Sequence, residues 1–477
     1  MNQESDAGSA AFEEREQIVA AGEAVDREHK PMMSTAQILL MNFGFFGIQY
    51  SFGMQQTAVN PVYQYLGADP DSLPLLNLAG PITGLLIQPM IGALSDRTWS
   101  DRWGRRKPYF IIGAIGCAIC LFLFPFVTAV WMAVLLLWLL DASNNTAMEP
   151  YRAFIADKLP NNQLAKGFLA QSFFTGLGIT LANFSLSFFR LILDGATEAG
   201  IPYWVFGAFM VGSVCAIASV LVSVLTTDEL PPTPEEKAEL ERLRAEGGGL
   251  GAVGRFLKNI GVAIIEMPVG LRKLALVYLF QWYAMNVYWQ YVAIAIGSGA
   301  FGLDTTQADY AQTTAYDNAV ALAGRLNGTY NIVTFLVAFA LAALARRHGA
   351  KWVHAVSLWC ATVGLLILPH LTSEIPMYAT MIGLGIAWAS IMGVPYIMAV
   401  RMIPREKYGV YMGIINMMIV VPQLLQTLSF GWIYQHLLGD DPENAVMLAG
   451  ILLGLGGIAM LWIREPRPEL DPKPIAA

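Results

Sequence analysis

Long runs of apolar residues alternate with short polar segments along the whole sequence. A helix needs about 20 predominantly apolar residues to cross a bilayer. Several of the runs contain Gly or Pro, which membrane helices tolerate when neighbouring groups satisfy the freed backbone. The pattern predicts twelve transmembrane helices, which are centred near Gly47, Ile82, Gly116, Leu139, Gly178, Gly212, Asn286, Phe335, Gly364, Gly385, Val420 and Gly454.

Among the connections between these helices, Lys and Arg residues occupy alternate ones. They lie in residues 97–107, 346–351 and 401–407, whereas the connections between them contain Asp and Glu but neither Lys nor Arg. Because positively charged loops stay in the cytoplasm, both termini are expected there. The first 30 residues have no apolar centre, so we interpret them as a cytoplasmic tail rather than a signal peptide. A long polar loop is expected on the outer side over residues 297–322.

The overall composition agrees with an integral membrane protein. Hydrophobic residues make up 55% of the 477 residues and charged residues 14%, against about 25% charged in typical soluble proteins. The formal net charge of −7 argues against a nucleic-acid partner. The five His residues are scattered over tails, loops and helix ends. We therefore expect neither an enzyme nor a metal site, and no cofactor other than a proton.

The chain divides into two similar halves around a polar segment that follows the sixth predicted helix. Pro150-Tyr151 near the end of helix four recurs as Pro395-Tyr396 in helix ten, which is typical of parallel six-helix repeats. Residues 235–246 have the charge pattern of a short surface helix. The fold is predicted to be all-α, with the domains 1–34 (cytoplasmic tail), 35–226 (first bundle), 227–273 (cytoplasmic linker), 274–464 (second bundle) and 465–477 (cytoplasmic tail).

The cytoplasmic connection between helices two and three carries a candidate gating motif. Asp96 could cap a helix start or pair with an Arg and so lock one conformation of a moving bundle. Gly92 would permit a close approach between helices. We expect the motif to control conformation rather than substrate binding; its residues are Gly92, Asp96, Arg97, Gly104, Arg105 and Arg106.

Helix four carries ionisable residues through an otherwise apolar span. Asp141 lies roughly 15 Å from the outer end of this helix, near the middle of the membrane. A carboxylate there costs about 2.5–3.5 kcal/mol even on lenient insertion scales, so it must face a cavity or a partner. Asn145, Glu149 and Arg152 continue the same face. We predict proton coupling at Asp141 and Glu149; the alternative is an ion-pair network that only holds helices together.

Amide side chains recur in several of the predicted helices. Each single amide is explained equally well by a hydrogen bond between helices, but the collection favours a polar, neutral solute. Arg325, a further charge in the outer half, is expected to pair with Asp317 as an outer gate. The candidate substrate-binding residues are Gln49, Gln56, Asn145, Arg152, Gln171, Asn286, Tyr288, Asn331, Asn416 and Gln423.

The two charged motifs resemble those of a known family. Gly92-x-Leu94-x-Asp96-Arg97, followed by Gly104-Arg105-Arg106, resembles the signature of the major facilitator superfamily, and its longer spacing resembles the sucrose transporters. Leu140-Asp141 with Asn144-Asn145, and the later Pro150-x-Arg152, are similar to helix four of the proton–sucrose symporters. That resemblance implies that Asp141 is the proton-coupling carboxylate and that Arg152 is essential to the sugar site. Glu149 departs from the plant members.

The resemblance and the residues together predict a proton-coupled importer of a disaccharide such as sucrose or maltose. We expect it to act as a monomer, in contact with lipid, in the inner membrane of a bacterium. A sodium-coupled symporter of the melibiose type would require carboxylates within helix two, which has none at mid-span. A non-transporting pigment or assembly protein would not need Asp141 and Arg152. A multidrug antiporter would have a more apolar cavity.

Overall fold

The computed structural model describes residues 30–232, 237–238, 241–242, 267–307, 309–402 and 408–463. Helices account for its regular structure, and all twelve predicted centres lie within them, which confirms the predicted fold class. The first bundle contains α2 (Thr35–Asn42), α3 (Gly44–Met54), η1 (Gln55–Val59), α4 (Asn60–Tyr65), η2 (Pro70–Ser72), α5 (Leu73–Leu76), α6 (Ala79–Asp96), α7 (Lys107–Leu123), η3 (Phe124–Phe126), α8 (Val130–Lys158), α9 (Asn161–Arg190) and α10 (Tyr203–Thr226). The second contains α13 (Val269–Phe301), η4 (Tyr310–Gln312), α14 (Thr314–His348), α15 (Ala350–Ile367), η5 (Leu368–His370), α16 (Glu374–Met402), α17 (Tyr408–Leu437) and α18 (Pro442–Met460).

Nine helical stretches of the described chain are long and apolar enough to cross a membrane by themselves. The spans that fall short of this criterion are the first, fourth and seventh, formed by α3 with η1 and α4, by α8 and by α13. These same spans carry Gln49, Asp141 and Asn286. Polar side chains therefore lower the hydropathy of the spans that supply much of the candidate site.

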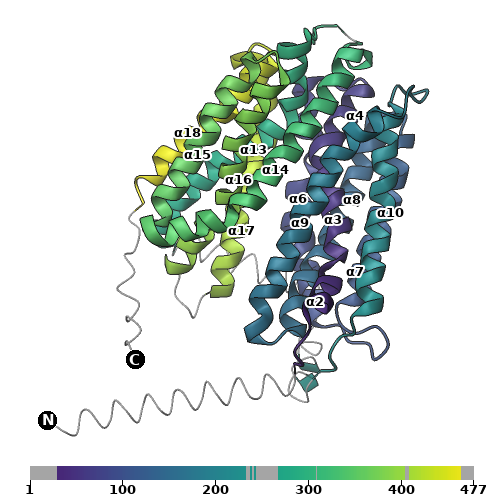
Figure 1. Ribbon diagram of the computed structural model, residues 1–477, viewed down its shortest axis with the longest axis vertical. Coiled ribbons are helices and arrows are strands. Elements are labelled where there is room, and N and C mark those ends of the chain that lie inside the picture. Colours follow the sequence, from purple (N-terminus) through teal and green to yellow (C-terminus); the bar gives the residue numbers. More distant parts are fainter. Residues whose placement is uncertain are drawn as a thin grey trace, which may run out of the picture.

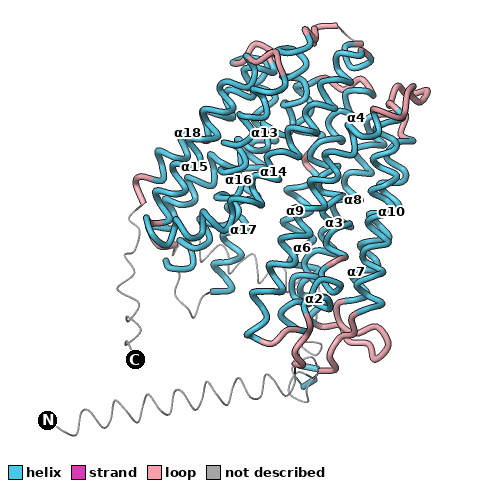
Figure 2. The backbone as a smooth tube through the Cα atoms, viewed as in Figure 1, coloured by secondary structure: helices cyan, strands magenta, loops and turns pink. Residues whose placement is uncertain are grey.

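The two bundles stand side by side and are inclined to one another (Figure 1). They meet at the outer end, and their ribbons diverge toward the end at which α2 lies (Figures 1 and 2). α9 packs against α14, and α5 and α6 pack against α17. Within the described residues, hydrogen bonds between the bundles run from the outer surface down to Thr57 and Asn327. In the orientation predicted from the Lys and Arg residues, the end at which the bundles are hydrogen-bonded together is the outer one.

The predicted long outer loop over residues 297–322 is wrong. α13 continues to Phe301, and α14 already begins at Thr314, where the Thr313 side chain accepts a hydrogen bond from the backbone N–H of Tyr316. Tyr316, Ala319 and Val320 are fully buried. The polar sequence of this segment reflects contacts with the other bundle rather than exposure to water. Most of the predicted surface helix over residues 235–246 lies outside the described residues.

Candidate functional site

Asp141 is buried in the middle of the first bundle, with 5% of its surface exposed. On the α6 side, a Cβ placed on Gly80 would stand 3.7 Å from Asp141 Oδ2, so the carboxylate lies against bare backbone. Within the described residues, no Lys or Arg forms an ion pair with Asp141. The carboxyl group is therefore enclosed without a compensating positive charge.

Asn145, one turn along α8, connects this helix to α6. Its side-chain nitrogen donates to Thr83 Oγ1 at 3.2 Å and to the backbone oxygen of Asp141 at 2.9 Å. Its side-chain oxygen accepts from Gln88 Nε2 at 2.7 Å. Both ends of the amide are thus occupied by interhelical or local bonds. In this conformation Asn145 supports the position of Asp141, and its part in sugar binding stays a prediction.

Glu149 and Arg152 form a second polar group, nearer the cytoplasmic end of α8. Arg152 Nη1 donates to Glu149 Oε1 at 2.8 Å, and Nη2 lies 3.7 Å from Met148 Sδ. Gln49 of α3 contacts the same sulfur atom through Nε2 at 3.8 Å. The Arg152 side chain is 49% exposed. The polar face predicted for helix four therefore consists of the buried Asp141 carboxylate and, nearer the cytoplasmic end, an accessible Arg152–Glu149 ion pair.

The second bundle presents a set of polar and aromatic side chains around α13 and α14. Tyr288 is fully buried, and its hydroxyl donates to Asn327 Oδ1 at 2.8 Å. Asn331 donates to the backbone oxygen of Asn327 on its own helix. Gln290 and Gln426 pair at 2.8 Å, a contact that the sequence pattern did not single out. The remaining candidates Asn286, Asn416 and Gln423 are half-buried, whereas Gln171 is buried with its amide nitrogen unbonded among the described residues.

Polar side chains surround a void between the bundles just beneath the hydrogen-bonded outer end, and in this conformation the void is too small to admit a water molecule. Helix one lines it with Gln56, Thr57, Asn60 and Gln64, and the second bundle contributes Trp289 among other residues. Amides, a hydroxyl and an indole ring are the groups that bind sugar hydroxyls and the apolar faces of sugar rings. The structure thus brings Gln56 together with Thr57 and Gln64, which the sequence pattern did not single out, while Gln49 lies deeper and on the cytoplasmic side.

The outer side is closed by a polar cluster around Asp317. Arg190, at the end of α9, donates to Asp317 Oδ2 at 3.2 Å and to Asn318 Oδ1 at 2.8 Å. The Tyr65 hydroxyl donates to Asp317 Oδ1 at 2.7 Å. The predicted pair between Arg325 and Asp317 is wrong, because Arg325 bonds to Glu374 at 2.7 Å instead. Arg325 and Asp317 lie eight residues apart on one helix, too far for the i,i+3 or i,i+4 pairing that neighbouring turns allow.

Removing the Arg190 guanidinium is expected to weaken the outer closure. Arg190→Gln deletes two charge-assisted bonds between the bundles, which should shift the population by about tenfold toward outward-open molecules. The measurement is the rate at which an impermeant maleimide labels Gln56→Cys from outside. Asp317→Asn should have a similar effect, and the double variant should add little to either. Unchanged labelling in both single variants would contradict this role.

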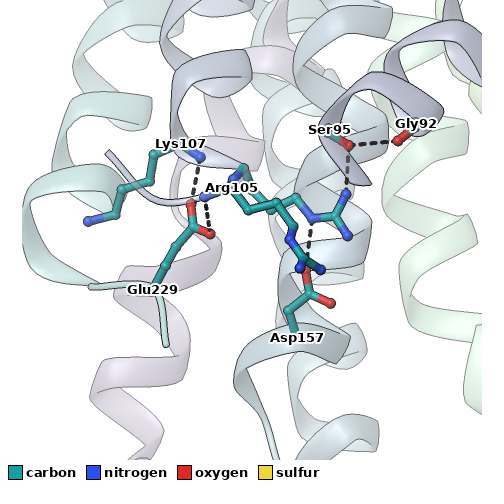
Figure 3. A network of polar contacts seen from close by, with 7 residues as sticks. Gly92, Ser95, Arg105, Lys107, Asp157 and Glu229 are labelled. Atoms are coloured by element: carbon teal, nitrogen blue, oxygen red, sulfur yellow. Dashed lines mark hydrogen bonds and ion pairs between the residues drawn. The ribbon is translucent and has the colours of Figure 1, made fainter. Parts of the chain in front are cut away.

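The cytoplasmic motif is organised by a carboxylate that the sequence analysis missed (Figure 3). Glu229, just past α10, accepts three backbone N–H bonds, from Arg105, Arg106 and Lys107, at 2.7–2.8 Å. These N–H groups belong to the start of α7, where the helix dipole also favours a negative charge. Arg106 is buried and donates to Asp157 at 2.8 Å. The sequence feature that could have indicated this contact is the acidic pair Asp228-Glu229, which directly follows helix six.

The glycines of the motif differ in what surrounds them. Gly104 has a left-handed backbone with φ +74°, and a Cβ there would stand 2.4 Å from the Glu229 carboxyl carbon. A Cβ on Gly92 would meet nothing within 4 Å, so the expected close helix approach is not present in this conformation. Arg97 is half-buried, and the side chain of Asp96 lies outside the described residues. Their gating role stays a prediction.

Gly104→Ala is expected to lower the turnover of transport and to leave sugar affinity near that of the parent. The left-handed backbone costs an alanine about 1–3 kcal/mol, and the new methyl group displaces Glu229 from the start of α7. Gly67→Ala is the matched control, because Gly67 has φ +85° but open space around its Cβ position. Maximal rate and binding affinity of the two variants separate the outcomes. A large loss of affinity at unchanged maximal rate in Gly104→Ala would contradict the prediction.

Comparison with known proteins gives matches over nearly the whole chain. The family model described as Major Facilitator Superfamily matches residues 41–419 and 274–476. Sucrose transport protein SUT1 from Oryza sativa subsp. japonica is 24% identical over 490 residues, covering 90% of this chain and 88% of the relative. Sucrose transport protein SUC4 from Arabidopsis thaliana is 25% identical over 483 residues, covering 90% and 89%. Both relatives are plant proteins, so the bacterial origin stays a prediction.

Solved structures resemble the fold at low sequence identity. The nucleoside transporter NupG has a TM-score of 0.61 at 15% identity and covers 91% of this chain and 100% of its own. A D-xylose–proton symporter has a TM-score of 0.59 at 14% identity, with coverage of 90% and 97%. At these identities the likeness shows the fold alone. With the family model matching most of its length, the chain belongs to the Major Facilitator Superfamily and is a multi-pass membrane transporter rather than an enzyme.

Proposed function

We propose that the protein is a proton-coupled symporter that takes up a neutral disaccharide, such as sucrose or maltose, by alternating access. The observation that carries this proposal is the buried carboxyl group of Asp141, which has no cationic partner among the described residues. A carboxylate buried without a counter-charge is costly, and binding a proton removes that cost. A group of this kind loads a proton when water reaches it and releases it in another conformation.

A sugar as the substrate is supported by two independent features. The sucrose transport proteins of rice and Arabidopsis align with about nine-tenths of this chain. Amide side chains and Trp289 line the closed void between the bundles, and these groups suit hydroxyls and the apolar face of a sugar ring once the bundles separate. The disaccharide, the bacterial inner membrane and the monomeric state are parts of the proposal.

Two features at opposite ends of the molecule support alternating access. The Arg190–Asp317 cluster closes the outer side, while the bundles diverge toward the cytoplasm (Figure 1). Arg152 and Glu149 lie on this cytoplasmic side of Asp141. A sugar held against Arg152 could leave toward the cytoplasm in this state. The outward-facing state requires the Asp317 cluster to separate.

The test is counterflow into proteoliposomes with a panel of labelled solutes. Vesicles preloaded with one unlabelled solute are mixed with labelled sucrose, maltose, glucose or a nucleoside. We expect rapid exchange of a disaccharide and little exchange of the nucleoside. Exchange of the nucleoside with none of the sugars would contradict the sugar assignment. Accumulation driven by a sodium gradient, with no response to a pH gradient, would contradict proton coupling.

A further inference from the structure

The ion pair between Glu149 and Arg152 is partly open to water. The two residues lie three positions apart on α8, and Arg152 Nη1 donates to Glu149 Oε1 at 2.8 Å. The Glu149 side chain is 28% exposed and the Arg152 side chain 49%. An ion pair this exposed contributes little to the stability of a fold. Its main consequence is therefore the charge that α8 presents to a ligand at this point.

The Arg152 guanidinium has further donors, and one of them is directed at a poor acceptor. Its Nη2 lies 3.7 Å from Met148 Sδ, and Nε2 of the buried Gln49, on α3, lies 3.8 Å from the same sulfur atom. A thioether sulfur accepts hydrogen bonds only weakly, whereas oxygen atoms accept them well. Donors from two helices thus converge on one weak acceptor. An oxygen atom of a ligand at this position would be a better partner for both donors.

Two kinds of sugar oxygen suit these donors, the hydroxyl of a neutral sugar and the carboxylate of a sugar acid. A guanidinium binds a carboxylate more strongly than a hydroxyl, because both partners are charged and the planar donors match two oxygens. An arginine without an acidic partner would therefore favour the sugar acid. Glu149 reverses this preference, because its charge offsets that of Arg152 and repels an anionic ligand. Asp141 cannot replace it, since it lies eleven residues from Arg152, about 16 Å along the helix axis.

We propose that Glu149 is a specificity-determining residue, which makes the site at Arg152 select neutral sugars and reject sugar acids such as uronates. The inference rests on the proposed function, because it requires a sugar to bind at Arg152. It gives Glu149 a role in the choice of substrate, separate from the proton coupling predicted from the sequence. Specificity of this kind comes from repulsion of the wrong ligand rather than from an added contact with the right one.

The test is calorimetric binding of matched neutral and anionic sugars to the purified parent and variant proteins. The probes are sucrose and maltose and, for each, the monocarboxylate in which one primary hydroxymethyl group is oxidised. The parent should bind the neutral sugar that it accepts about tenfold more tightly, or better, than the corresponding acid. Glu149→Gln should reduce this ratio by about tenfold or more, mainly through tighter binding of the acid. The affinity gained should fall as the salt concentration rises.

Three further variants separate the charge of Glu149 from its contribution to the fold. Glu149→Asn removes the charge with a shorter side chain and should behave like Glu149→Gln, so failure of one variant to fold does not end the test. Glu149→Asp keeps the charge and should keep the preference for the neutral sugar. Glu374→Gln is the matched control, because it removes the acidic partner of Arg325 in the first turn of α16. It should leave the ratio of the two affinities unchanged.

Three results overturn the inference while leaving a sugar as the substrate. The first is a parent that binds the acid as tightly as the neutral sugar. The second is a parent-like ratio in both Glu149→Gln and Glu149→Asn. The third is an equal loss of affinity for both sugars in these two variants, which indicates that the ion pair only shapes the site. By contrast, a parent that binds none of the four probes contradicts the proposed function itself.

Discussion

Asp141→Asn is expected to abolish uphill accumulation of sugar while exchange of sugar across the membrane survives. The amide has the shape of the carboxyl group but cannot carry a proton, so the substituted protein resembles a permanently neutral site. An inward gradient of one pH unit supports up to about tenfold accumulation at one proton per sugar. The variant should reach an inside-to-outside ratio of about one. Labelled sugar in proteoliposomes, with and without the gradient, gives this ratio directly.

Counterflow by the same preparation separates a coupling defect from misfolding. Exchange by Asp141→Asn should continue at a rate within about tenfold of the parent, because exchange requires no net movement of protons. Asp304→Asn is the matched control, since this outer-loop carboxylate is exposed and, among the described residues, accepts hydrogen bonds from Thr306 and Gln307 of its own loop. It should accumulate sugar like the parent. Full accumulation by Asp141→Asn would remove this carboxylate from the mechanism.

Arg152→Lys is expected to weaken sugar binding by more than about tenfold, or at least about 1.4 kcal/mol. The guanidinium holds Glu149 with one terminal nitrogen, and its half-exposed face leaves further planar donors for a pair of sugar hydroxyls. Lys retains the charge but loses the planar fork. Calorimetry of sugar binding to the purified variant measures the loss.

Two further variants show whether a loss of sugar affinity is specific to the Arg152 guanidinium. Arg347→Lys changes an exposed arginine at the cytoplasmic end of α14 and should bind sugar like the parent. Glu149→Gln removes the acidic partner and tests whether the ion pair itself is needed. Parent-like affinity in Arg152→Lys would make this arginine structural, as in the alternative in which the charges of helix four only hold helices together.

The positions of the helices could be predicted from the sequence, because the length of an apolar run and its Gly and Pro residues are local properties. The repeat also survives in the structure, since Pro150 and Pro395 both lie inside long helices, α8 and α16. The start of α14 could not be predicted in this way. Its polar residues are buried by the other bundle, and hydropathy alone does not distinguish that burial from exposure.

The partners of charged residues were the least predictable part of the site. Glu229 meets the start of α7 only after the sixth helix returns to the cytoplasm, so no local pattern links the two segments. Arg190 reaches Asp317 across the bundle interface in the same way. The π-helical turn η1 (Gln55–Val59) could not be predicted either, because its sequence is equally compatible with an α-helix. Asp141 was predictable because a carboxylate within an apolar span is costly wherever its partners lie.

The central claim is that sugar and protons cross together through a site that contains Asp141. Its most direct test is the pH of a weakly buffered suspension of proteoliposomes when sugar is added outside. The parent should take up protons with the sugar, so the external medium becomes more alkaline, and Asp141→Asn should give no such change although it still exchanges sugar. Sugar uptake by the parent without proton movement, or an equal proton signal from Asp141→Asn, would contradict the claim.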